Sequence, residues 1–109
     1  MTNKLSFSEI EVQVEDYIFF VIRASKNYQA ERFSLQIKNG SMCFFNAYED
    51  SSEFFLFPAI SATDHDKTLV YALDERKDFL IKLYNAIRNH PSIRLKLLHS
   101  LGPIKQYEA

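Results

Sequence analysis

Residues 33–48 read Phe33-Ser-Leu-Gln-Ile-Lys-Asn-Gly-Ser-Met-Cys-Phe-Phe-Asn-Ala-Tyr48 and decide the fold class. Apolar and polar residues alternate up to Ile37, which is the period of a strand with one buried face. Asn39-Gly40 then separates this run from a second apolar run. Asn-Gly between two strand patterns predicts a two-residue β-turn in which both central residues have a positive φ. We therefore expect an antiparallel hairpin over 33–48.

A two-residue turn would also fix the register of this hairpin, with Lys38 opposite Ser41. One face would then carry three pairs: Ile37 with Met42, Leu35 with Phe44, and Phe33 with Asn46. The reverse face would carry Cys43 beside Gln36 and Phe45 beside Ser34. The first face is strongly apolar, so Phe45 is expected on the more mixed face of the sheet.

The chain before the hairpin predicts two more strands. Five apolar residues alternate with polar ones, but the alternation shifts by one residue between Phe7 and Ile10. A one-residue bulge near Ser8–Glu9 would restore all five to one face of the strand. Glu15–Asp16 then makes a plausible turn, and the apolar run from Tyr17 to Ile22 is typical of a strand covered on both faces. The five alternating positions are Leu5, Phe7, Ile10, Val12 and Val14.

The chain after the hairpin changes character near residue 74. Before that point we expect an acidic turn over 49–53, a short strand Phe54–Phe57 ended by Pro58, a loop over 59–67 and a last strand Thr68–Ala72. Asp74 is a good N-cap for a following helix. The helix would bury one stripe at helical spacing and end at Pro91. Its stripe is Phe79, Leu80, Leu83, Tyr84 and Ile87.

A second helix is expected from about Ser92 to Leu101, with Gly102 and Pro103 as its stop signals. The sequence thus predicts an α+β protein with an antiparallel sheet of five to six strands packed by two C-terminal helices. It reads as a single domain over 1–109, with strands over 1–73, helices over 74–102 and a tail over 103–109. Both a strongly curved sheet capped by a helix and a flatter half-open sandwich are compatible with this pattern.

Composition excludes several classes of protein. With 47% hydrophobic and 25% charged residues the chain has the composition of a folded domain, not of a disordered tail. No apolar run approaches the roughly 20 residues that span a bilayer, and the N-terminal residues do not have the pattern of a secretory signal. The lone Cys43 cannot form an internal disulfide. We therefore expect a cytoplasmic protein without a membrane segment.

No motif in the sequence indicates catalysis. Two glycines are too few for a glycine-rich phosphate loop. Cys43 lies in mid-strand, where a free cysteine behaves as a small apolar residue. Asp64-His65-Asp66 is the one close cluster of ligand-type residues and reads as a solvated turn. We expect no catalytic residue, metal or cofactor; the enzyme alternative is a cleft around Tyr71, Tyr84 and His90.

Charge is segregated along the chain, although the net charge is −1. Residues 1–66 hold ten acidic and five basic residues, whereas 67–109 hold four acidic and eight basic ones. Complementary charge steers association, so the acidic part could face a basic protein. Nucleic-acid binding by the basic C-terminal helices is the weaker alternative, since the pI of 6.3 lacks the usual basic excess.

The leading hypothesis is a non-catalytic protein-binding module, most concretely a small bacterial inhibitor of the immunity-protein or antitoxin kind. Its partner would be one protein, for example a basic toxin. A homodimer that closes its Phe-rich sheet faces is the main alternative. The expected contact residues are Glu49, Asp50, Glu53, Asp64 and Asp66 for charge, with Tyr48 and Phe45 as aromatic anchors.

Overall fold

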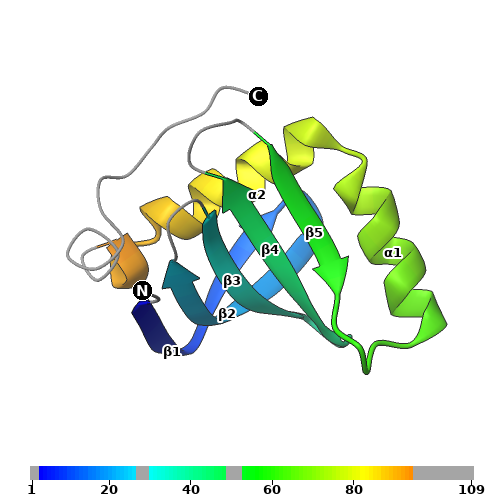
Figure 1. Ribbon diagram of the computed structural model, residues 1–109, viewed down its shortest axis with the longest axis horizontal. Helices are drawn as coiled ribbons and strands as arrows, with labels where there is room; N and C mark the ends of the chain where they lie inside the picture. Colours follow the sequence, from blue (N-terminus) through cyan, green and yellow to red (C-terminus); the bar gives the residue numbers. More distant parts are fainter. Residues whose placement is uncertain (1–2, 27–29, 49–52, 95–109) are drawn as a thin grey trace.

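The computed structural model describes residues 3–26, 30–48 and 53–94. The strands make one antiparallel sheet in the order β1-β2-β3-β4-β5, and two helices follow them (Figure 1). This confirms the predicted α+β class. The elements are β1 (Asn3–Val14), β2 (Tyr17–Lys26), β3 (Ala30–Ile37), β4 (Met42–Tyr48), β5 (Phe54–Pro58), α1 (Asp64–Asp74) and α2 (Lys77–Asn89).

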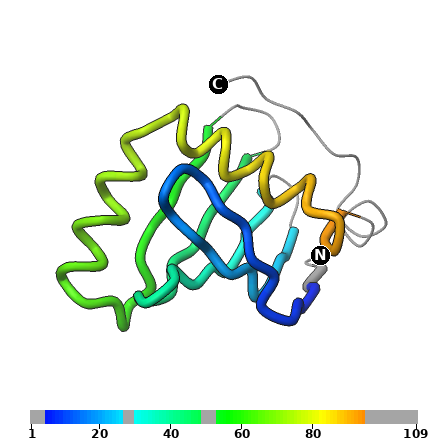
Figure 2. Tube along the Cα trace, turned by 180° about the vertical axis from the view of Figure 1, so that it is seen from behind, coloured from blue at the N-terminus to red at the C-terminus, as the bar shows by residue number. Residues whose placement is uncertain are grey.

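The sheet is strongly curved. Helix α2 contacts both β1 and β5, although these strands are the two opposite edges of the sheet. Figures 1 and 2 show the two sides of this arrangement, with β4 and β5 nearer the viewer in one and the β1–β2 hairpin nearer in the other. The curved sheet capped by a helix is therefore the arrangement that the chain adopts.

The core lies between the concave face of the sheet and α2. The α2 side chains at Phe79, Leu83 and Ile87 are fully buried, as the helical stripe predicts. They meet strand residues such as Phe19 and Leu35, which are also fully buried. On the opposite face of β2 the side chains are only half-buried, so this strand is not covered on both faces by the described residues.

Strand β1 contains the predicted bulge. Its register with β2 shifts between Ser6 and Ile10, and Glu9 has a φ of 39°. The shift brings Phe7 and Val12 to the buried face and leaves Glu9 and Glu11 exposed. The turn expected at Glu15–Asp16 is also present, with a φ of 56° at Glu15.

The hairpin of β3 and β4 is present, but the predicted register is wrong by one residue. Leu35 pairs with Cys43 and Phe33 with Phe45. The loop is longer than expected because Ile37 accepts from the Gly40 N–H at 2.8 Å, and only Asn39 has a positive φ, of 61°. A shift of one residue exchanges the two faces of a strand. Phe45 therefore lies in the core, and Phe44 lies on the outer face.

The predicted sixth strand over Thr68–Ala72 is instead part of α1 (Asp64–Asp74). Thr63 caps this helix, since its hydroxyl accepts from the Asp66 N–H. Val70 and Leu73, three residues apart, supply the buried side chains, and α1 packs against β5. The strand prediction gave weight to the β-branched residues in 68–72 and missed this helical spacing.

Asp74 does not cap the following helix as predicted: it is the last residue of α1, and Arg76 is the N-cap of α2. The predicted helix itself is confirmed over Lys77–Asn89. Of the second predicted helix, residues 91–94 are helical, and the rest lies outside the described residues.

Candidate interaction surface

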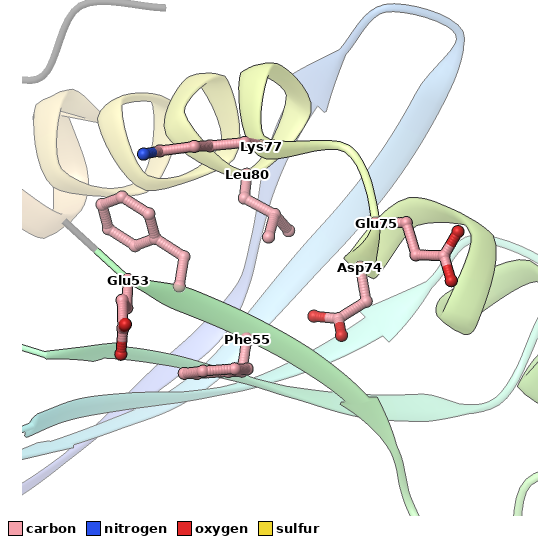
Figure 3. A pocket seen from close by; sticks show the side chains of 7 residues that line it. Glu53, Phe55, Asp74, Glu75, Lys77 and Leu80 are labelled. Carbon is pink, nitrogen blue, oxygen red and sulfur yellow. The ribbon is translucent and has the colours of Figure 1, made fainter.

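A groove of about 270 Å³ lies between β5 and the corner where α1 meets α2 (Figure 3). Its floor is apolar, since Phe54 and Leu80 are buried beneath it. Charged side chains surround the floor, and Figure 3 shows Asp74 turned toward β5 while Glu75 points outward. The lining residues are Glu53, Phe54, Phe55, Asp74, Glu75, Lys77 and Leu80.

Asp74 fixes the geometry of this groove. Its Oδ1 accepts a hydrogen bond of 2.6 Å from the backbone N–H of Leu56 on β5. Because β5 is an edge strand, such an N–H would otherwise be open to pairing with another strand. Pro58 on the same strand has no N–H to offer. The end of α1 is thus tied to β5, and the edge is blocked against strand addition at Leu56.

The groove combines negative charge with exposed aromatic surface. Three carboxylates line it against one ammonium group, that of Lys77. Phe55 is 41% exposed, and its ring meets that of Tyr48 edge-to-face with centroids 5.8 Å apart. An apolar floor ringed by carboxylates fits a lysine or arginine, whose alkyl stem packs on apolar surface while its charged end stays at the rim.

The structure brings together only part of the acidic set expected from the sequence. Glu53 and Tyr48 lie at the groove or beside it, whereas Asp64 and Asp66 begin α1. Asp64 and Asp74 are the two ends of the 11-residue helix α1, which separates the two places by about 15 Å. Glu49 and Asp50 lie outside the described residues.

The Asp66 carboxylate is hydrogen-bonded to other residues of the fold. Its Oδ2 accepts from the Ser41 hydroxyl at 2.6 Å and from the Thr63 hydroxyl at 2.8 Å. These hydrogen bonds, with that of Ser41 the larger cause, lower the pKa of the Asp66 carboxyl below its usual value. The carboxylate therefore ties the start of α1 to the β3–β4 turn, which is a structural role.

This role predicts a pH-dependent effect of Asp66→Asn. The folded-state pKa of Asp66 is lowered, so its stabilising contribution is present above the unfolded-state pKa of about 3.9 and is lost as the pH falls through the folded-state value. Urea denaturation should show a loss of stability in Asp66→Asn at pH 6 that shrinks at pH 2.5. Asp64→Asn, in the same helical turn, is the control. An equal loss for Asp66→Asn at both pH values would contradict this role.

The structure does not place Phe45 as a surface anchor. Its side chain is fully buried and stacks on Phe54 with centroids 5.8 Å apart. It also contacts the rings of Phe33 and Tyr84. The one-residue register shift explains this change, and it leaves Phe55 and Tyr48 as the aromatic residues near the groove.

The residues considered for catalysis occupy separate environments. Tyr84 is buried and donates a hydrogen bond of 2.8 Å to Glu31, whereas Tyr71 is 57% exposed on α1. Cys43 is buried, and burial raises the pKa of its thiol to about 12, which disfavours the nucleophilic thiolate. Within the described ranges, no group of three or more His, Cys, Asp or Glu side chains could hold a metal ion.

Sequence reasoning missed Asp74, Glu75, Lys77 and Leu80 as parts of this surface. The signal that could have indicated them is the polar run Asp74-Glu-Arg-Lys77 between two apolar helical stripes. Such a run marks an exposed corner between helices. Nothing in the sequence places that corner beside Glu53, more than 20 residues earlier in the chain.

No protein-family model matches this chain, and neither the curated proteins nor the solved structures gave a match. None of the described helices is both long and apolar enough to cross a membrane.

Proposed function

We propose that this protein is a non-catalytic binding module for one protein partner, and that the groove beside β5 receives a basic segment of that partner. The observation that carries the proposal is the groove itself, in which Glu53, Asp74 and Glu75 surround an apolar floor next to the exposed ring of Phe55. Charged groups around such a site give specificity and speed association, and the central apolar contact supplies affinity.

The most concrete form of this proposal is a small cytoplasmic inhibitor of the immunity-protein or antitoxin kind, which neutralises a basic bacterial toxin. Inhibition of this kind needs a complementary surface and no chemistry of its own. The carboxylates at the groove support it, because they offer charge complementary to lysine and arginine side chains.

The test is capture of the partner from a lysate of the source organism by the tagged protein after nuclease treatment, with mass spectrometry of the bound proteins. The double variant Glu53→Lys/Glu75→Lys should bind the captured protein more weakly by on the order of tenfold, because two ion pairs become repulsions. Both residues are exposed, so the variant should keep the fold.

The matched control is Glu11→Lys/Asp64→Lys, which reverses two exposed carboxylates away from the groove with the same change in net charge. It should capture the partner as the unmodified protein does. If the groove variant retains the same protein with unchanged affinity, or if the unmodified protein captures none, the proposal is wrong.

A further inference from the structure

The outer face of β4 and β5 carries a strip of aromatic rings. Side chains alternate between the two faces of a strand, so these rings lie on the face of the sheet that is turned away from the core-facing Phe45 and Leu56. Figure 1 shows this face turned to the viewer, with α2 behind the two strands. Phe55 at 41% exposure and Met42, the first residue of β4, at 37% exposure are among the large hydrophobic side chains that remain exposed. The strip consists of Phe44, Tyr48, Phe55 and Phe57.

Arg32 on β3 lies across one end of this strip. Its guanidinium carbon is 4.2 Å from the centre of the Phe44 ring and 5.3 Å from that of Phe57. The Arg32 guanidinium makes no hydrogen bond or ion pair with any residue that the structure describes, and Arg32 is exposed. Stacking on the two rings therefore holds a planar cation in place while its N–H groups stay available to a carboxylate.

Glu53 lies at the other end of the strip, where its backbone oxygen accepts from the Tyr48 N–H. Its carboxylate has no ion pair among the described residues. By contrast, three cations of α2 and its N-cap are paired: Arg76 and Lys82 with Glu15, and Arg88 with Glu31. Among the residues that the structure describes, the aromatic strip thus has an unpaired charge of each sign at its flanks, Arg32 and Glu53.

We propose that a second copy of this chain docks on the aromatic strip about a two-fold axis near β4. Arg32 lies on β3 and Glu53 lies directly before β5, at either side of β4, so such an axis exchanges their positions. Arg32 of each copy then meets Glu53 of the other, and the rings cover one another. An isologous interface requires this self-complementarity.

Other ways of covering this face fit less well. Edge-to-edge strand pairing through β5 is blocked at two positions. The Leu56 N–H already donates to Asp74, and Pro58 has no N–H to donate. Stacking of nucleic-acid bases would have to displace Arg32 from Phe44 and Phe57. A partner with charge of one sign would leave either Arg32 or Glu53 facing like charge.

The test is the molar mass of the purified protein by light scattering and sedimentation at micromolar concentrations. The unmodified chain should be a dimer. Arg32→Glu and Glu53→Arg should each raise the dimer dissociation constant by on the order of 100-fold, since a two-fold interface turns one substitution into two repulsive contacts. An equimolar mixture of the two variants should form a dimer again, because opposite charges then meet at both positions.

A monomeric unmodified chain, or a dimer that Arg32→Glu leaves intact, would overturn the proposal. So would a mixture that stays monomeric. Glu75→Lys changes the groove and lies outside the strip, so it should leave the dimer unchanged. Because Glu53 and Phe55 belong to both surfaces, the two proposals are separated by variants at other residues. Partner capture by Glu75→Lys tests the groove, and the molar mass of Arg32→Glu tests the dimer.

Discussion

Replacing Arg88 by methionine should lower the free energy of unfolding by about 3–5 kcal/mol. Arg88 is 1% exposed, and its Nη1 lies 3.0 Å from Oε2 of Glu31, whose side chain is 8% exposed. The substitution keeps most of the apolar stem but removes the cation, so the Glu31 carboxylate stays buried without it. A loss of this size is large beside the roughly 5–15 kcal/mol by which folded domains are stable.

Guanidinium denaturation followed by circular dichroism measures this loss. Arg94→Met is the matched control, since Arg94 is exposed in the helical residues 91–94 that follow α2, and its cost should stay within about 0.5 kcal/mol. The double variant Glu31→Gln/Arg88→Met should be less destabilised than the sum of its two single variants, because it buries no unpaired charge. Equal stability of Arg88→Met and Arg94→Met would show that the pair contributes little.

The ion pair also explains how α2 is held in the curved sheet. Glu31 lies on β3 and Arg88 near the end of α2, so the pair joins the middle strand to the capping helix. Tyr84, one turn earlier on α2, donates to the other oxygen of Glu31 at 2.8 Å. A sequence pattern cannot indicate such a pair, because its members are 57 residues apart and each alone is typical of an exposed position.

Local sequence patterns correctly predicted the elements that are determined by residues close together in the sequence. The bulge of β1 follows from a one-residue shift in the alternation of apolar and polar residues within ten residues. Helix α2 follows from its apolar stripe. Helix α1 was missed because Leu69-Val70-Tyr71 fits a short strand as well as a helix. The helix is favoured by the Thr63 cap and by the packing of Val70 and Leu73 near β5.

The candidate site was predictable only in part, for a spatial reason. The sequence predicts one acidic surface that includes Glu53 and Asp64, which are close along the chain. The direction of α1 carries the chain back along β5, which puts Asp74 and Glu75 beside Glu53 and leaves Asp64 at the far end. Since that direction depends on α1 being a helix, the missed helix and the missed groove residues are one error.

The register of the β3–β4 hairpin can be tested by a pair of adjacent substitutions. Phe45→Ala should cost about 3–5 kcal/mol of stability, because Phe45 is fully buried among Phe33, Phe54 and Tyr84 and its removal leaves a cavity. Phe44→Ala should cost about 1–2 kcal/mol of stability, because it removes a half-buried ring and the contact of that ring with Arg32.

The order of these two losses decides between the registers. A two-residue turn at Asn39-Gly40 would put Phe44 in the core and Phe45 outside, so Phe44→Ala would then be the more damaging variant. With the loop closed by the Gly40 N–H on Ile37, the order is reversed. Urea denaturation of the two variants measures it directly. Because both variants lose the same atoms from neighbouring positions, their difference reports which face of β4 is buried.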